Sequence, residues 1–169
     1  LGIRYRQMMV IVLLDIDGTL LTAGGAGRAA LVAAMRQELG PDIPEAKVEI
    51  AGRTDRGILG DLLMAYELPG DEENFLRLLQ MYLDHLPAEL ERATGHVLPG
   101  VPELLSELAE MDEAYLGLLT GNVAVAARAK LAHYQIHTPF LFGGYGDDHA
   151  DRGDVAAAAI ADAERHLGR

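Results

Sequence analysis

Two carboxylates stand at the end of an aliphatic run near the start of the chain, where Asp15 and Asp17 follow residues 10–14 (Val-Ile-Val-Leu-Leu). Such a run before a glycine predicts a buried strand that ends in a turn at Gly18. In an open α/β sheet, ligands bind at the carboxyl ends of the strands. Side chains two residues apart share one face of a strand, and a glycine lets the backbone turn after them. The pattern indicates phosphoryl transfer, in which one carboxylate attacks and the other moves protons.

Composition bounds the other possibilities. A chain of 169 residues, half of them hydrophobic, is about one domain with a mainly aliphatic core. Cysteine is absent, which excludes thiolate catalysis and disulfides and fits an intracellular protein. The net charge of −12 disfavours nucleic acid and anionic membrane surfaces as partners. A small anionic substrate would therefore need local cations and a metal ion.

The start of the chain carries neither a membrane span nor a signal peptide in this interpretation. No stretch approaches the roughly 20 apolar residues of a membrane helix. The segment from Met8 to Leu14 has no cleavage site for a signal peptidase, and cleavage there would destroy the motif. We expect a cytoplasmic protein. Because Met8 and Met9 stand just before the strand, residues 1–7 are expected to be an addition, or the chain a processed piece.

Helical and strand patterns alternate along the chain, which favours a parallel sheet flanked by helices. Helices are expected over residues 28–39, from Thr54 or Asp55 to 66, and over 72–93, 102–111, 123–134 and 154–167, the last capped by Asp154. Further strands are expected over residues 115–119 and 140–142, with a weak strand pattern over 48–51. The segment between the first two strong strands is therefore a mostly helical insert.

The motifs at two strand ends resemble those of the haloacid dehalogenase superfamily, in its phosphatase branch with a helical cap inserted after the first strand. Residues 15–20, Asp-Ile-Asp-Gly-Thr-Leu, match the first motif of that family, and Thr120, which follows Leu118-Leu119, matches the second. The resemblance extends from about Val10 onward. It implies an α/β fold with a Rossmann-like core made of residues 8–22 and 98–169, and a helical cap made of residues 23–97.

The resemblance and the chemistry together assign roles. Asp15 is expected to attack phosphorus and Asp17 to act as general acid and base. Two carboxylates facing a phosphate need a divalent cation, and oxygen ligands suit Mg²⁺. In the family, the Asp15 side chain and the Asp17 carbonyl hold this metal. Residues expected to bind the phosphoryl group are Gly18, Thr19, Thr120, Gly121 and Asn122. The alternatives are a polar turn at Asp15–Gly18 and an ordinary helix N-cap at Thr120.

The third motif of the family is a cation that neutralises the nucleophile and the phosphate. Arg152 stands in the expected place but lacks the proline that commonly follows a lysine there. Arginine suits phosphate geometry, although it differs from lysine in reach. Lys130 is the competing candidate, nearly three helical turns after Thr120, and a solvated Arg152 is the third possibility. In the cap, Arg53 is expected to contact the leaving group; the alternative is a helix cap with an exposed arginine.

The fourth motif of the family, an acidic pair on a later strand, is absent before the chain stops at Arg169. The acidic residues 147, 148, 151 and 154 follow the third strand and are a weak substitute. We therefore expect a chain truncated before this motif, with one edge of the first strand unpaired. The favoured function is a Mg²⁺-dependent phosphatase acting on a small phosphorylated metabolite, similar to phosphoglycolate. The alternatives are an incomplete fragment that persists by strand exchange or as a homodimer, and a phosphomutase.

Overall fold

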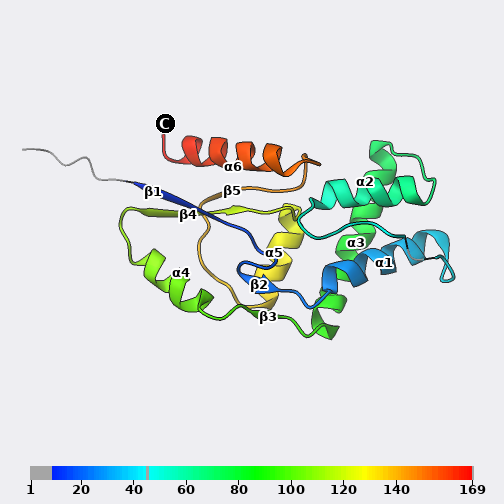
Figure 1. Cartoon of the computed structure of the whole chain (residues 1–169), viewed down its shortest axis with the longest axis horizontal. Helices are drawn as coiled ribbons and strands as arrows, with labels where there is room; N and C mark the ends of the chain where they lie inside the picture. The colour runs from blue at the N-terminus through cyan, green and yellow to red at the C-terminus, as the bar shows by residue number, and fades with distance from the viewer. Residues whose placement is uncertain (1–8, 45, 169) are drawn as a thin grey trace, which may run out of the picture.

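A computed structural model describes residues 9–44 and 46–168. Three parallel strands form its sheet in the order β1-β4-β5, with bounds β1 Val10–Leu14, β4 Ala114–Leu119 and β5 Phe142–Gly144. Val10 lies opposite Ala114, and Gly117 lies opposite Phe142. Helix α6 covers one face of the sheet, while α4 and α5 lie on the other (Figure 1). The parallel sheet flanked by helices confirms the predicted fold class.

Strand β5 begins two residues later than predicted. The expected strand covered residues 140–142, because Gly143 and Gly144 resemble a turn in the sequence. A Cβ on Gly144 would collide with the carbonyl of Val155, and a Cβ on Gly117 would collide with the ring of Phe142. These glycines allow helix α6 and the neighbouring strand to pack closely. They therefore belong to the strand.

The helices beside the sheet are α4 Val101–Ala109, α5 Ala124–His133 and α6 Arg152–His166. Their ends lie within two residues of the predicted ones. The predicted N-cap of the last helix is wrong, because Asp151 and not Asp154 occupies that position. The Asp151 carboxylate accepts a hydrogen bond from the Gly153 N–H at 2.6 Å. Asp154 lies in the first helical turn, where its negative charge interacts favourably with the helix dipole.

Three helices form a group beyond the carboxyl edge of the sheet, at the right of Figure 1. We call this group, with the loops between its helices, the helical insert; its helices are α1 Ala26–Leu39, α2 Asp55–Ala65 and α3 Glu72–Arg92. Helix α1 packs along α3, whose buried residues recur at helical spacing: Phe75, Leu78, Tyr82, Leu86 and Leu90. Residues 48–51 form no strand, because Val48 and Ile50 pack against the hydrophobic core of the helices.

Two connections between the sheet and the helical insert lie side by side. Strand β2 Leu21–Thr22 pairs antiparallel with β3 His96–Val97. A Cβ on Gly24 would lie 2.7 Å from the backbone nitrogen of Gly95, so the two chains approach very closely here. The predicted limits of the core and the cap, residues 22–23 and 97–98, fall on this pair. Residues 8 and 169, and the expectation for residues 1–7, lie outside the described residues.

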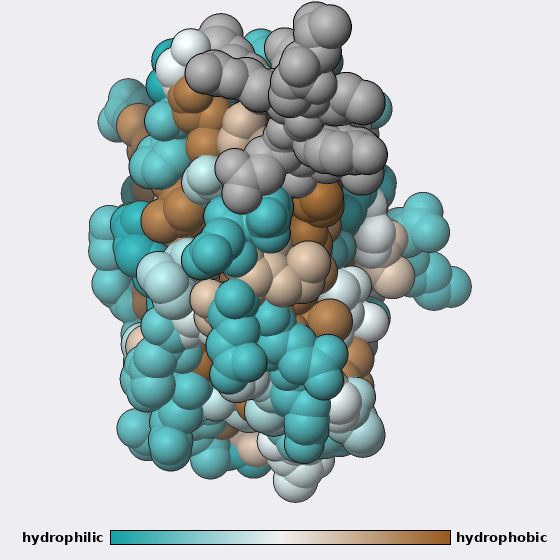
Figure 2. All heavy atoms as spheres, turned by 90° about the vertical axis from the view of Figure 1, so that its left-hand side faces the viewer, coloured by the Kyte–Doolittle hydropathy of each residue, from teal (hydrophilic) through white to brown (hydrophobic). Residues whose placement is uncertain are grey.

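The free side of β1 forms an edge of the sheet within the described part of the chain. Val10 and Ile11 are 42% and 44% exposed, so the start of this strand is less buried than predicted. Figure 2 views this end of the molecule and shows separate apolar areas among polar side chains. Among the described residues, none of the helices has the length and apolar character needed to cross a membrane.

Candidate active site

A cavity of about 360 Å³ lies between the carboxyl edge of the sheet and the helical insert. The sheet side of this cavity carries residues from the ends of β1 and β4 and from α5 and α6. The insert side carries residues from α1, the loop before α2, and α3. Its polar lining residues include Asp15, Asp17, Arg28, Arg53, Asp55, Tyr82, Asn122, Lys130 and Arg152. Residues far apart in the sequence thus meet at the position predicted for the site.

Asp15 is held between the start of the turn and the start of α6. Its Oδ1 accepts a hydrogen bond from the Ile16 N–H at 2.8 Å, and its Oδ2 accepts one from the Arg152 guanidinium at 2.9 Å. The two side chains are 26% and 35% exposed. A charged hydrogen bond of this kind neutralises the carboxylate and fixes its orientation. Arg152 is therefore not the solvated residue of the third possibility.

Asp17 has a different cation. Its Oδ2 accepts hydrogen bonds from Lys130 Nζ and from Asn122 Nδ2, both at 2.7 Å. Lys130 also donates to Asn122 Oδ1 at 2.6 Å, so the three side chains form a closed network. The Lys130 side chain is 6% exposed and that of Asp17 is 43% exposed. The two candidates for the third-motif cation thus contact different aspartates.

Lys130 reaches this position because of its helix. It lies on the buried face of α5, with Ala126 and Ala127 one turn before it. Long helical side chains point toward the N-terminus of their helix, and two small residues leave room for the Lys130 chain to do so. Asn122 comes directly before this helix and meets the lysine. Lys130 stands nearly three helical turns after Thr120 in the sequence, which argued against a place in the site. The direction of long helical side chains, toward the N-terminus of the helix, could have predicted this position.

Residues predicted to bind the phosphoryl group fall into two sets. Gly18, Gly121 and Asn122 line the cavity, whereas Thr19 and Thr120 do not. Thr19 is exposed, and Thr120 is fully buried, where its hydroxyl accepts from Asn122 Nδ2 at 2.8 Å. Gly18 has a φ of 81° and donates its N–H to the Leu21 carbonyl, so this N–H is engaged within the turn.

The alternative reading of Thr120 as a helix N-cap is wrong. Val123 occupies the N-cap of α5, and no side chain caps that position. Thr120 instead supports Asn122, whose backbone N–H and side-chain amide both face its hydroxyl. It thereby helps to orient the amide that contacts Asp17.

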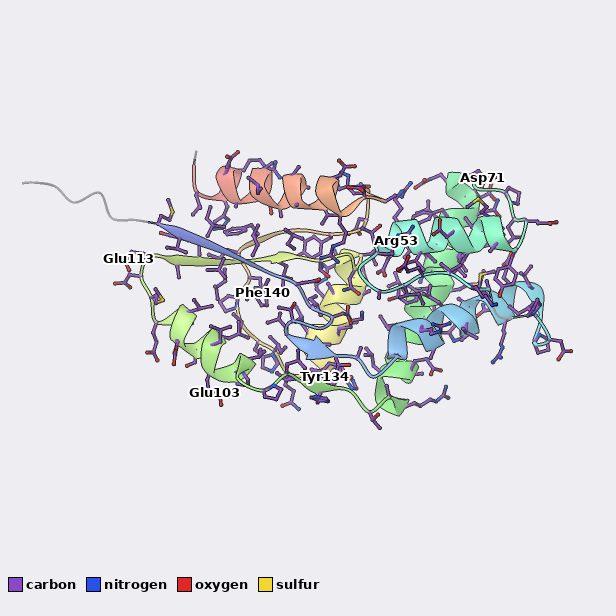
Figure 3. The ribbon with its side chains drawn as sticks, viewed as in Figure 1. Arg53, Asp71, Glu103, Glu113, Tyr134 and Phe140 are labelled. Atoms are coloured by element: carbon purple, nitrogen blue, oxygen red, sulfur yellow. The ribbon has the colours of Figure 1, made fainter. Side chains whose placement is uncertain are left out.

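The loop before α2 docks on the sheet side of the site. The Asp55 N–H donates to the Gly121 carbonyl at 2.7 Å, and the Thr54 hydroxyl donates to the Ala150 carbonyl at 2.9 Å. A Cβ on Gly121 would collide with the Arg53 carbonyl, so only glycine permits this approach. Figure 3 shows Arg53 at the junction of the sheet and the helical insert. Its guanidinium pairs with Asp61 at 2.9 Å, and its side chain is 35% exposed.

Asp55 and Tyr82 are functional candidates that were not predicted from the sequence. Burial raises the pKa of Asp55 to about 6, and the hydrogen bond from the Val123 N–H opposes part of this rise. Burial also raises the pKa of Tyr82 well above its ordinary value, so its phenol stays neutral. Each residue looks ordinary in the sequence, as a helix cap and as a core aromatic. Only the docking of the helical insert brings them to the cavity.

The donor set fits a magnesium ion held mainly by water and substrate. Among the described residues, no group of three His, Asp or Glu side chains is placed to hold a metal. Mg²⁺ commonly binds one or two carboxylates and completes its shell with phosphate oxygens and water. Asp15 and Asp17 meet that requirement. The acidic residues after β5 do not assist, because Asp147 accepts from the Ala124 N–H and Asp151 caps α6.

Together these features describe an α/β core with an acidic site at the carboxyl edge of its sheet and a helical insert over that site. The family model described as haloacid dehalogenase-like hydrolase matches residues 12–169. The chain belongs to this family. The family resemblance and the fold predicted from the sequence are therefore confirmed.

Several solved structures share this fold. CbbY from Rhodobacter sphaeroides, in complex with phosphate, is 18% identical in sequence and has a TM-score of 0.71. The match covers 96% of this chain and 74% of the CbbY chain. A predicted phosphatase from Clostridium acetobutylicum is 21% identical with a TM-score of 0.65, covering 95% and 71%. A predicted phosphoglycolate phosphatase from Haemophilus somnus is 18% identical with a TM-score of 0.58, covering 86% and 65%. No curated protein matches the chain significantly.

Proposed function

We propose that this protein hydrolyses a small phosphate monoester through a phosphorylated aspartate. The observation that carries the proposal is the pairing of each aspartate after β1 with its own cation, at 2.9 Å for Asp15 and Arg152 and 2.7 Å for Asp17 and Lys130. A nucleophile and a proton carrier in one cavity need separate control of their charges. The phosphate bound to CbbY and the predicted phosphatase activity of other structures with this fold are consistent with such a substrate.

In the first step, an Asp15 oxygen attacks phosphorus and the bond between phosphorus and the ester oxygen breaks. Asp17 gives its proton to the departing alcohol oxygen. Arg152 lies within hydrogen-bond reach of Asp15 and offers its remaining N–H groups to the phosphoryl oxygens. In the second step, Asp17 takes a proton from water, the water oxygen attacks phosphorus, and Asp15 is released with inorganic phosphate.

Lys130 and Asn122 act on Asp17 in this scheme. Both donate to Oδ2, which leaves Oδ1 as the oxygen available to exchange a proton with the alcohol and with water. Two donors on one oxygen also restrict rotation of the carboxylate. Lys130 is therefore a positioning residue, distinct from the cation that faces the nucleophile.

Magnesium belongs to the proposal as the metal that Asp15 and Asp17 would hold. When bound, it would neutralise the phosphate dianion beside two carboxylates and act as a Lewis acid. The chain has a net charge of −12, so local cations and a metal are needed to admit an anionic substrate. Phosphoglycolate, which the name of the Haemophilus somnus structure specifies, is the reference ester for asking which alcohol the site accepts.

The test is hydrolysis of a generic aryl phosphate with Mg²⁺ and with a chelator. Wild-type protein is expected to release inorganic phosphate only with the metal, and Asp15→Asn is expected to lose activity by at least about 10³-fold. Asp112→Asn changes an exposed carboxylate outside the cavity and serves as the matched control. Activity that survives Asp15→Asn would disprove the mechanism. Transfer of phosphate to a second hydroxyl without release would favour the phosphomutase alternative.

A further inference from the structure

A second cavity of about 150 Å³ lies inside the helical insert, between α1, α2 and the loop that connects them. Ten of its twelve lining residues are apolar or aromatic: Leu31, Val32, Met35, Ile43, Ala46, Val48, Ile50, Ile58, Leu62 and Tyr66. The other two are Arg28 and Arg36. The lining is therefore mainly apolar, which is typical of sites that bind small organic groups.

The wall of this cavity is fixed by one tyrosine. The Tyr66 hydroxyl donates to the Pro44 carbonyl at 2.6 Å and accepts from the Ala46 N–H at 3.0 Å. Its polar atom is therefore satisfied by the loop, and its ring is left to line the cavity. The loop is thereby tied to the end of α2. The cavity is thus a built feature of the helical insert.

The two cavities adjoin each other. Arg28, Leu31, Ile50 and Ile58 line both the active-site cavity and the apolar one. The two cavities therefore adjoin along these four side chains. A group attached to a phosphate at Asp15 extends toward them when it points into the helical insert, because the sheet side of the site is occupied by the charged network.

We infer that the apolar cavity binds the alcohol part of the substrate, so the substrate is a phosphate monoester of an apolar alcohol up to the size of a benzyl group. This inference rests on the proposed function. An engineered cavity of the same volume, lined by Leu, Ile and Phe, binds benzene. A group of that size therefore fits here, with the phosphate at Asp15 and Arg152.

The size and lining of the apolar cavity disfavour a small charged alcohol. A glycolate carboxylate directed into the helical insert would lie beside Arg28 and the aliphatic side chains of Leu31, Ile50 and Ile58. It would leave the apolar cavity unfilled. An apolar alcohol gains contacts with the same side chains. The substrate class is thereby narrowed beyond a small phosphate monoester.

The binding test uses protein labelled with ¹³C at the methionine methyl groups. Met35 is buried and lines the apolar cavity, whereas Met64 and Met111 are exposed and outside both cavities. Benzylphosphonate is expected to shift the Met35 signal saturably and to bind about tenfold more tightly than methylphosphonate. A Met35→Leu variant assigns the signal. A Met35 signal that moves no more than those of Met64 and Met111 would overturn the inference.

Filling the cavity provides the matched comparison. Val48→Phe, with Ala46→Leu as a second variant in case the first fails to fold, is expected to abolish the Met35 shift and the preference for benzylphosphonate. Leu76→Phe adds the same ring at an exposed position of α3 and is expected to change neither. Retention of the preference in both filled variants, when folded, would overturn the inference.

Turnover separates this inference from the proposed function. Benzyl phosphate is expected to exceed phosphoglycolate in kcat/KM by about tenfold, and Val48→Phe is expected to remove that difference. Hydrolysis of both esters at equal kcat/KM would support the phosphatase and overturn the apolar subsite. If neither ester is hydrolysed, the proposed function fails, and the phosphonate titration still decides whether the cavity binds the apolar group.

Discussion

At the scale of single residues, the site gives a different cation to each of the two aspartates that follow β1. Asp15 and Asp17 are two residues apart, yet Arg152 from α6 pairs with one and Lys130 from α5 pairs with the other. Each helix thus controls one of the two aspartates in the proposed reaction. The two cations also differ in type. The planar Arg152 guanidinium faces the phosphoryl site, and the Lys130 ammonium faces the proton carrier.

Lys130→Met is predicted to lower kcat with little change in KM. Without the ammonium, Asp17 Oδ2 keeps only the Asn122 donor, so the carboxylate is less well positioned for proton transfer. A fall in kcat of about tenfold to hundredfold is expected, less than the roughly 10²- to 10⁴-fold that a general acid or base contributes, because Asp17 itself is retained. Steady-state kinetics on an aryl phosphate measure both constants, and thermal unfolding checks that the variant is folded.

The opposite pattern would assign Lys130 another role. If KM rises while kcat stays the same, the lysine binds phosphate directly and acts as a second phosphate cation. Lys130→Arg keeps the charge and is expected to recover part of the lost kcat. Arg152→Lys provides the comparison at the nucleophile, where loss of the planar fork is expected to affect both constants.

Asp55 predicts a dependence of folding stability on pH. Burial raises the pKa of its carboxyl from 3.8 to about 6. Between these values the folded state retains a proton that the unfolded state releases, so the stability contributed by Asp55 falls as pH rises and is constant above pH 6. Asp55→Asn keeps an acceptor for the Val123 N–H without a charge. It is expected to be more stable than the wild type above pH 6, by about 2 kcal/mol.

Urea unfolding at several pH values between 4 and 8 measures this difference. The expected difference in stability is smaller than the full pKa shift implies, because the Asp55 side chain keeps partial exposure to solvent. Asp42→Asn, on an exposed loop residue, is the control for a general change in charge. Stability curves of wild type and Asp55→Asn that run parallel over this range would contradict the prediction.

The sequence predicted the residues whose role follows from a strand end, and missed those that depend on docking. Asp15, Asp17 and Asn122 stand at the ends of the strand patterns, so their meeting follows from a parallel sheet. Asp55 and Tyr82 belong to helices whose approach to the sheet is set by packing. No local sequence pattern reveals this approach, because a capping aspartate or a core tyrosine has the same pattern whether or not it lies in an active site.

At the scale of elements, Thr54 connects the helical insert to the sheet side of the site. Its fully buried hydroxyl accepts from the Gly57 N–H at 3.1 Å as the N-cap of α2 and donates to the Ala150 carbonyl. Thr54→Val keeps the shape and removes both bonds. We expect the free energy of unfolding to fall by about 2 kcal/mol, combining a lost cap with an unsatisfied carbonyl.

Thr54→Ser retains the hydroxyl and is the matched control for this prediction. It is expected to stay within about 1 kcal/mol of the wild type, because only a methyl group is removed. Urea unfolding measures both variants. A loss in the serine variant with none in the valine variant would show that packing of the methyl group, and not the two hydrogen bonds, stabilises this junction.

Helices were predictable from their apolar spacing, whereas the ends of β5 were not. The apolar spacing over residues 72–93 predicted a helix, and α3 covers Glu72–Arg92. In contrast, β5 uses Gly143 and Gly144 as strand residues because α6 approaches them closely. Glycine signals a turn and a close approach equally well in a sequence. Only tertiary packing distinguishes the two.

At the scale of the whole molecule, the described sheet has an exposed edge beside its most important strand. Strand β1 pairs with β4 on one side, and on its other side no strand is present among the described residues. An unpaired edge offers backbone donors and acceptors to another chain. The edge of β1, the strand that Asp15 directly follows, can therefore also form a contact between copies of this protein.

Association through this edge is the prediction at that scale. Val10 and Ile11 are both more than 40% exposed, so two β1 edges can pair and bury apolar side chains together. Light scattering after size exclusion is expected to show dimers that increase with concentration. Ile11→Lys places a charge on the edge, which opposes such pairing, and is expected to shift the protein toward monomer.

Leu104→Lys tests whether the effect is specific to the edge. Leu104 is 44% exposed on α4, away from the edge of the sheet, so this charge is expected to leave the dimer unchanged. An equal response of both variants would indicate general association of apolar surface. A wild-type protein that stays monomeric at every concentration would contradict pairing through β1. If dimers form, turnover per subunit of wild type and Ile11→Lys at equal concentration shows whether a paired edge improves the positioning of Asp15, since that residue directly follows the strand.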